Sequence, residues 1–229
     1  MKEISKKEFC VVERGAVTFL DVLGWKGIWQ QNESAIEGLY SLVQWTNKTA
    51  EKISQEYCNI PELRGKSEIT KVLSISDTIV LFTAGPYKTA IEIQARICSE
   101  LLPYALGQEL PLRGAISYGE YSVRDNIMLG YAVDEAASWH ETTDWIGVIL
   151  TPSAQMRFQQ DNCMSIARYD CIPFKRAERT LNMCVDWSFS DRNRLDAVIT
   201  KKGPHTPEIA PKYLNTLAYL NRSHTDGGE

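Results

Sequence analysis

The sequence predicts an α+β domain, on three observations. Short apolar runs rich in β-branched residues alternate with longer segments whose apolar residues recur at helical spacing. Of the 229 residues, 44% are hydrophobic and 24% are charged, which is typical of a folded globular chain and excludes a disordered one. No internal repeat, low-complexity tract or Gly/Ser linker divides the sequence. One compact domain is therefore favoured.

The N-terminal part predicts a strand, a helix and a hairpin. Residues 15–20 (GAVTFL) form a short buried strand that ends at Asp21, and a helical pattern follows over 25–57. Residues 69–82 (ITKVLSISDTIVLF) contain two β-rich runs separated by Ser76-Asp77, which is typical of a β-hairpin.

Helices and strands continue to alternate along the rest of the chain. A helix fits 86–102, because Pro103 lies just past its end, and a strand follows over 112–121. Next come a helix over 131–141, a buried strand over 145–151 and the start of a helix over 152–159. Two short strands fall within 165–187, and two C-terminal helices follow over 191–201 and 208–221.

The opening order β-α-β-β-α-β is that of the ferredoxin-like arrangement. One face of such a sheet stays open unless another element or another chain covers it. We therefore expect a dimer partner on that face.

Charge and cysteine content exclude several classes of protein. The 25 Lys and Arg against 29 Asp and Glu give a net charge of -4, so no basic surplus indicates a nucleic-acid polymer or an anionic membrane as partner. The N-terminus lacks the apolar core of a signal peptide, and no stretch approaches the roughly 20 apolar residues of a membrane helix. The six Cys show no CxxC spacing, and only three His are present, which argues against a zinc site. We expect a cytoplasmic protein with reduced thiols.

Asp21 and Asp77 are the residues from which a reaction can be argued. Taken alone, Asp21 fits a helix N-cap and Asp77 fits a turn. In a βαββαβ sheet the first strand lies beside the hairpin, so both carboxylates can meet at one edge. With no Arg or Lys built in between them, they repel each other unless a cation joins them, and hard oxygen ligands suit Mg²⁺ or Mn²⁺. Two such ions would bind a triphosphate. The backbone N–H groups of residues 22–25, at the start of the predicted helix, would donate hydrogen bonds to its oxygens.

Four segments of the chain resemble the class III nucleotidyl cyclases. FLDVLGW (19–25) is similar to their first metal motif, F-x-D-I-x-G-F, and SISDTIVLF (74–82) to the hairpin that carries their second metal-binding Asp. LRGAISYGEY (112–121) resembles their R-x-G-I-x-x-G strand, and LGYAVDEAASW (129–139) occupies the place of their G-x-x-V-N-x-A-S-R-L helix. The resemblance covers roughly residues 15–187.

That resemblance implies a cyclase domain over 1–187, with a ferredoxin-like core, and a C-terminal helical extension over 188–229. It implies that Asp21, Asp77 and the backbone carbonyl of Val22 bind two metal ions. Lys175 falls where related cyclases carry a phosphate-contacting lysine, which makes Asp21, Asp77 and Lys175 the expected catalytic residues. The expected nucleotide-binding residues are Phe19, Val22, Leu23, Gly24, Trp25 and Lys175.

The chain also departs from the family pattern. The family's transition-state Asn and Arg fall on Asp134 and Ser138, neither of which can replace a guanidinium beside a developing phosphate charge. The purine-reading positions hold Leu73 and Ile127, which cannot hydrogen-bond a base edge. The chain is then a dead cyclase or a cyclase with a different base pocket. Positive charge would come from Lys175, with Arg113 as a second choice that has an equally good structural role.

A closer resemblance favours the different base pocket. The LRGAIxxGE strand, the VDEAASW helix and a late PFK…VDW stretch resemble the Pycsar cyclases, bacterial anti-phage enzymes that make cyclic UMP or cyclic CMP. This implies a homodimer with two composite sites, Mn²⁺ (or Mg²⁺) as cofactor, UTP or CTP as substrate, and a separate effector protein that reads the product. UTP is the first choice, which makes the chain a uridylate cyclase. The alternatives are a cytidylate cyclase and a non-catalytic, nucleotide-sensing dimer.

Overall fold

The computed structural model describes residues 12–25, 34–66, 68–158, 163–176, 181–187, 195–196, 198, 200 and 206–222. The predicted helix over 191–201 and the early part of the predicted helix over 25–57 lie largely outside these residues.

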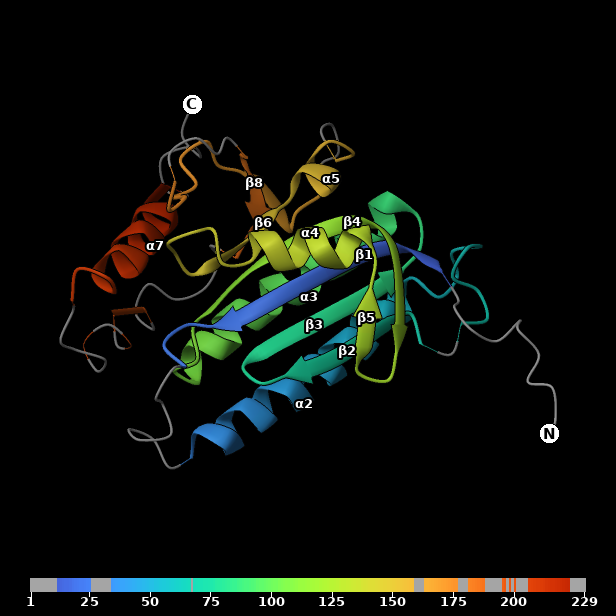
Figure 1. Ribbon diagram of the computed structural model, residues 1–229, viewed down its shortest axis with the longest axis horizontal. Helices are drawn as coiled ribbons and strands as arrows, with labels where there is room; N and C mark the ends of the chain where they lie inside the picture. Colours follow the sequence, from blue (N-terminus) through green and yellow to red (C-terminus); the bar gives the residue numbers. More distant parts are fainter. Residues whose placement is uncertain are drawn as a thin grey trace.

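The described strands form one sheet (Figure 1). They are β1 (Glu13–Val22), β2 (Thr70–Ile75), β3 (Thr78–Ala84), β4 (Leu112–Arg124), β5 (Ile127–Leu129), β6 (Gly147–Leu150), β7 (Ile166–Arg168) and β8 (Met183–Val185). Their order is β2-β3-β1-β4-β6-β8-β7, and β5 pairs with the end of β4. The helices are α2 (Ala35–Glu56), α3 (Tyr87–Gly107), α4 (Tyr131–Trp139), α5 (Pro152–Gln155) and α7 (Ala210–Arg222).

The four strands at one side of the sheet confirm the predicted α+β class and its ferredoxin-like core. β1 lies between β3 and β4 and pairs antiparallel with both, while β2 forms the outer strand beside β3. Helix α2 connects β1 to β2, and α3 connects β3 to β4. This is the split βαβ topology, and β6, β8 and β7 extend the same sheet beyond β4, with β6 parallel to β4.

Helices cover the two faces of the sheet unequally. The main hydrophobic core forms between the sheet and helices α2 and α3, and includes Leu20, Leu81 and Ile97. A second, smaller cluster lies under α4 on the opposite face, where Val17 and Phe82 meet Ala136. Figure 1 shows α4 in front of β1 and β4, with α3 behind them. The β2–β3 end of the α4 face is left without a helix among the described residues, as the fold predicts.

The C-terminal helix α7 packs on the β6–β8 side of the sheet. Its Tyr219 ring is fully buried and makes an edge contact with Trp145, at 5.0 Å between ring centroids. Tyr169 and Trp187 complete this aromatic cluster. The helix predicted over 208–221 is therefore confirmed, and it packs on the same sheet as the rest.

The structure corrects three local expectations. Pro103 lies inside α3, which continues to Gly107 because the turn after the proline buries Ala105 and Leu106 in the core. Trp25 is not helical, and the described part of the next helix begins at Ala35. The short strand β5 was not predicted, since its three residues give too little pattern to detect.

None of the described helices is long and apolar enough to cross a membrane. The cysteines of the described part are free thiols.

Candidate active site

The strand register brings Asp21 next to the β2–β3 hairpin. Asp21 is opposite Thr78 in the β1–β3 pair and opposite Arg113 in the β1–β4 pair. Asp77, the residue before Thr78, accepts a hydrogen bond at its carbonyl oxygen from the Val22 N–H, at 3.2 Å. The ends of the two segments that carry the predicted carboxylates are thus joined by a backbone hydrogen bond.

The predicted turn at Ser76-Asp77 is confirmed. Ile75 pairs with Thr78, so Ser76 and Asp77 form the two-residue connection of the hairpin. Ser76 has φ 56°, in the left-handed region that tight hairpin turns require. The turn leaves the half-buried Asp77 just before the start of β3, beside the end of β1.

A salt bridge occupies the site that we expected to contain carboxylates alone. The Arg113 guanidinium donates from Nη2 to Oδ2 of Asp21 at 2.9 Å, and their side chains are only 7% and 13% exposed. The expectation that no Arg or Lys is built in here is therefore wrong. The sequence spacing alone did not reveal it, because Arg113 lies 92 residues away and only the β1–β4 register brings it opposite Asp21.

Arg113 is held on its other side by the chain that follows α4. Its Nη1 donates to the carbonyl oxygens of Glu141 and Thr143, at 3.3 and 3.2 Å. Its buried Nε has no hydrogen-bond partner among the residues that the structure describes. The guanidinium is therefore fixed between β1 and the segment after α4.

The surroundings of the Asp21 carboxyl shift its pKa. Burial raises the pKa of Asp21 above its ordinary value, and the hydrogen bond and charge of Arg113 only partly oppose this rise. The negative charges of Asp77 and Glu141 raise the pKa further. Burial is thus the main reason that the neutral form of this carboxyl is favoured, and the charges of Asp77 and Glu141 contribute less.

Lys175 lies near the same group of charges. It is exposed, and its backbone N–H donates to the Thr142 carbonyl at 2.9 Å. Partial burial lowers the pKa of its ammonium, and the positive charge of Arg113 lowers it further, which indicates that the two cations are neighbours. The resemblance to the cyclases predicted a phosphate-contacting role for Lys175, which stays a prediction.

The N–H groups expected to receive phosphate are partly engaged. The Val22 N–H is bonded to Asp77, and the Leu23 N–H donates to the Pro111 carbonyl at 2.8 Å. Neither is open to a phosphate, because the strand continues through Val22 and no helix starts there. Gly24 follows with φ 79°, a left-handed turn that only glycine adopts without strain. The predicted phosphate contact is therefore wrong for the N–H groups of Val22 and Leu23, and it stays a prediction for Gly24 and Trp25.

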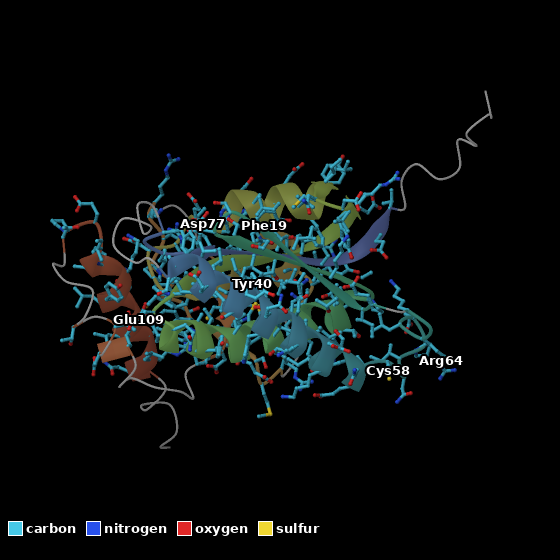
Figure 2. All side chains as sticks on the ribbon, turned by 90° about the horizontal axis from the view of Figure 1, so that it is seen from below. Phe19, Tyr40, Cys58, Arg64, Asp77 and Glu109 are labelled. Carbon is cyan, nitrogen blue, oxygen red and sulfur yellow. The ribbon has the colours of Figure 1, made fainter. Side chains whose placement is uncertain are left out.

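A cavity of about 430 Å³ opens beside the carboxylates on the α4 face of the sheet. Phe19 and Val80, paired across β1 and β3, form its floor, and the β4–β5 turn forms one wall. The His140 ring packs on Phe19, with centroids 5.7 Å apart. Figure 2 shows Phe19 and Asp77 close together on the same side of the molecule. The full lining is Phe19, Ile75, Thr78, Val80, Asn126, Ile127, Met128 and His140.

The two positions that depart from the family's base-reading pattern lie at this cavity or next to it. Ile127 lines it with 71% of its side chain exposed. Leu73 pairs with Val80 and packs against the smaller hydrophobic cluster. The cavity is therefore mainly apolar, with Thr78, Asn126 and His140 as its polar groups.

Asp134 and Ser138, which replace the family's Asn and Arg, are exposed on α4. The Ser138 hydroxyl donates to the Asp134 carbonyl within the helix, at 2.6 Å. Neither residue supplies positive charge to the site.

The donor set suits a divalent cation that a substrate helps to bind. Among the described residues, no group of three or more His, Cys, Asp and Glu side chains is arranged to hold a metal ion by itself. Asp21 and Asp77 lie at adjacent strand ends and, with the Val22 carbonyl, are the oxygen donors that the sequence predicts for a metal ion, although Oδ2 of Asp21 is already bonded to Arg113. Mg²⁺ and similar ions are commonly bound in this way, with one or two carboxylates and with substrate phosphates and water as the other ligands.

Solved structures show to which proteins this fold is similar. The catalytic core of a rhodopsin-guanylyl cyclase with converted specificity, in complex with ATPαS, matches with a TM-score of 0.52 and 14% identity over 77% of this chain and 97% of that chain. An adenylate/guanylate cyclase/hydrolase from Silicibacter pomeroyi matches with a TM-score of 0.50 and 12% identity over 77% of this chain and 98% of that one. The chain has the class III nucleotide cyclase fold. No protein-family model and no curated protein matches the sequence.

The class III cyclase fold explains why distant segments meet at this site. In the ferredoxin-like core of this cyclase fold, the central strand β1 ends between the β2–β3 turn and the start of β4. Any polar residues at those three points share one end of the sheet. Here they are Asp21, Asp77 and Arg113.

Proposed function

We propose that the protein is a nucleotide cyclase that converts a pyrimidine nucleoside triphosphate, UTP in the first place, to the 3′,5′-cyclic nucleotide and pyrophosphate. The observation that carries this proposal is the position of Asp21 and Asp77 on adjacent, directly bonded strand ends. The cavity beside them has room for a base. The structural similarity to known cyclases, at 12–14% identity, supports the fold alone. The proposed reaction is inferred from the residues of the site.

Asp21, Asp77 and the Val22 carbonyl would hold two Mn²⁺ or Mg²⁺ ions, which supply activation of the ribose 3′-hydroxyl and charge neutralisation at the phosphates. The 3′-oxygen forms a bond to the α-phosphorus, its proton goes to solvent, and the α–β phosphoanhydride bond breaks to release pyrophosphate. The protein contributes fixed carboxylate positions, because both strand ends are tied to the sheet by backbone hydrogen bonds.

Arg113 and Lys175 supply the positive charge that Asp134 and Ser138 lack. Arg113 is held in place by Asp21 and by two carbonyls, so its guanidinium is preorganised next to the triphosphate. Lys175 is exposed at the rim of the same group of charges and is free to reach the outer phosphates. Gly24 and Trp25, which follow β1, would contact the phosphates, and Phe19 forms the floor of the proposed base cavity. Leu23 is left out of this scheme because its N–H is bonded to Pro111.

The apolar lining of the cavity supports a pyrimidine base. Leu73 and Ile127 have no groups to pair with a purine edge, while Asn126 and His140 can hydrogen-bond a smaller ring placed deeper in the cavity. Uracil is our first choice and cytosine the alternative.

The open part of the α4 face supports a homodimer with composite active sites. Ile75 and Ile127 at the cavity rim are 43% and 71% exposed, and Leu129 in β5 is 54% exposed. A second copy of the chain would cover these apolar side chains and the cavity. We place this dimer in the cytoplasm, in bacterial anti-phage defence, with a separate effector protein that reads the cyclic nucleotide.

A nucleotide-sensing dimer without catalysis is the second candidate. The exposed Asp134 and Ser138, in place of an amide and a guanidinium, favour it. The pair of carboxylates at adjacent strand ends argues against it, because a sensor need not keep two metal ligands.

The deciding experiment incubates the purified protein with each of the four nucleoside triphosphates and Mn²⁺ and identifies products by mass spectrometry. We expect cyclic UMP, with cyclic CMP as the weaker product. A cyclic purine nucleotide as the main product would contradict the assignment of the base pocket. No cyclic product from any triphosphate, together with tight nucleotide binding, would support the sensor.

Substitution of the carboxylates tests the residues themselves. Asp21→Asn and Asp77→Asn should each lower kcat by at least about 10³-fold, because metal-assisted charge stabilisation contributes several kcal/mol. Glu51→Gln is the matched control, since Glu51 is an exposed carboxylate on α2, away from the site. Turnover retained in both Asp variants would exclude the two-metal scheme.

A further inference from the structure

Helix α7 is bound to the chain segment 141–146, which connects α4 to β6. The Asn215 side chain donates from Nδ2 to the Asp144 carbonyl at 2.8 Å, and Lys212 Nζ lies 3.4 Å from Asp144 Oδ1. The Ile146 N–H donates to the Thr216 hydroxyl at 2.9 Å. Together with the Trp145–Tyr219 contact, α7 thus holds three successive residues of the segment.

The same segment holds Arg113. The carbonyl oxygens of Glu141 and Thr143, immediately before the residues that α7 contacts, accept the two hydrogen bonds from Arg113 Nη1. The Thr142 carbonyl accepts the Lys175 N–H. Residues 141–143 are therefore bonded to the Arg113 guanidinium and to the Lys175 backbone, and residues 144–146 are in contact with α7.

We propose that α7 is a positioning element for the active site, with Asn215 and Thr216 as positioning residues that act on Arg113 through segment 141–146. The role assigned to Arg113 rests on the proposed function. Neither Asn215 nor Thr216 touches the carboxylates or the cavity. They fix the two carbonyls that aim the guanidinium at Asp21 and at the triphosphate. The C-terminal part of the chain thereby becomes part of the catalytic apparatus.

Burial gives this connection its rigidity. Thr216 is fully buried, and its hydroxyl donates to the Lys212 carbonyl while it accepts from Ile146. Arg113 is 6% exposed, and Thr143 and Ile146 are fully buried. A buried segment in close packing cannot shift alone, so a change at Thr216 is transmitted to Arg113.

The test uses a matched set of threonine variants. Thr216→Val keeps the shape but removes the acceptor of the Ile146 N–H, and Thr216→Ser restores it. Thr46→Val is the control, because Thr46 is a fully buried helix residue whose hydroxyl donates to the carbonyl four residues earlier, at 2.8 Å, but it lies in α2. Asn215→Ala removes the second contact. All variants are first shown to be folded at the assay temperature by thermal unfolding.

Two readouts separate positioning from stability. We expect Thr216→Val and Asn215→Ala to raise the KM for the triphosphate by about fivefold, which corresponds to about 1 kcal/mol, while Thr216→Ser and Thr46→Val keep the wild-type KM. In ¹⁵N-labelled protein, the Arg113 guanidinium resonances, assigned by their loss in Arg113→Lys, should shift in Thr216→Val and Asn215→Ala only.

Each contrary result has a defined meaning. Unchanged Arg113 resonances overturn the inference, and so do shifted resonances with wild-type KM and kcat. If the wild-type protein turns over no triphosphate, the proposed function fails. The resonances alone then decide whether α7 positions Arg113.

Discussion

Arg113 and Asp21 form a buried ion pair across β1 and β4, with Nη2 and Oδ2 2.9 Å apart. The pair has two consequences. It holds the end of β1 in register with the start of β4, and it places a guanidinium beside the proposed metal ligands. Because both side chains are mostly buried, removal of one partner leaves an uncompensated charge in a medium that solvates it poorly.

The first prediction concerns this pair. Arg113→Met should lower the free energy of unfolding by about 3–5 kcal/mol, since it leaves Asp21 buried and unpaired. The double variant Asp21→Asn/Arg113→Met should lose clearly less than the sum of the single losses. Urea denaturation of the four proteins measures the coupling. Additive losses would show that the pair does not act as a unit in the folded chain.

The second prediction concerns the buried thiol of Cys184 in β8. Burial raises the pKa of this thiol from its ordinary 9.0 to about 12. Between these values the unfolded chain releases the thiol proton and the folded chain keeps it, so the stabilisation is complete below pH 9.0 and falls as the pH rises. The loss is about 1.4 kcal/mol per pH unit. Urea unfolding between pH 8.5 and about 10.5 should therefore show a shallower decline for Cys184→Ala than for the wild type. Parallel declines would contradict the predicted shift.

The third prediction concerns a buried polar network in the main core. The Gln94 side chain on α3 donates to the carbonyls of Ala16 and Leu81, at 2.8 and 3.1 Å, and accepts from the Thr18 hydroxyl. Gln94→Met should destabilise the fold by about 1–3 kcal/mol, because Thr18 then lacks its acceptor. Adding Thr18→Val should recover part of the loss, as measured by thermal unfolding. A further loss of similar size in the double variant would contradict this explanation.

The fourth prediction concerns Gly114 in β4, which is paired with Leu20 between Phe19 and Asp21. A Cβ at Gly114 would collide with the Phe19 carbonyl oxygen and with the Leu20 side chain. Gly114→Ala should therefore push β1 away from β4, lower stability by about 1–3 kcal/mol and reduce turnover. Gly119→Ala is the control, because a Cβ there meets only Ala132, at 3.5 Å. Equal effects of the two substitutions on turnover would contradict a local displacement of β1.

The sequence predicted the parts of this fold that depend on local chemistry. The hairpin at Ser76-Asp77 followed from two β-rich runs around a polar dipeptide, and the strand before Asp21 from an apolar run that ends in a charge. Both carry their signal within a few residues. The end of α3 was placed too early, at Pro103, because the core contacts that extend this helix to Gly107 have no local signature.

The candidate site was predictable in its carboxylates but not in its cation. Asp21 and Asp77 could be brought together from topology, since the first strand of this fold lies beside the hairpin. The bond from Arg113 to Asp21 depends on the exact register of β1 and β4. A shift of one residue would turn Arg113 to the other face of the sheet. The engaged N–H groups of Val22 and Leu23 depend on the same pairing.

By itself, the sequence determined the α+β class, the order of the elements and the two carboxylates at strand ends, because hydrophobic periodicity and turn chemistry are properties of short segments. Only the tertiary structure decided that Arg113 joins Asp21, that a cavity opens beside Phe19, and that α7 is tied to the segment that holds Arg113. Each of these joins residues far apart in the chain, through strand register and close packing. Such contacts depend on the whole fold and cannot be predicted from any one segment of the sequence.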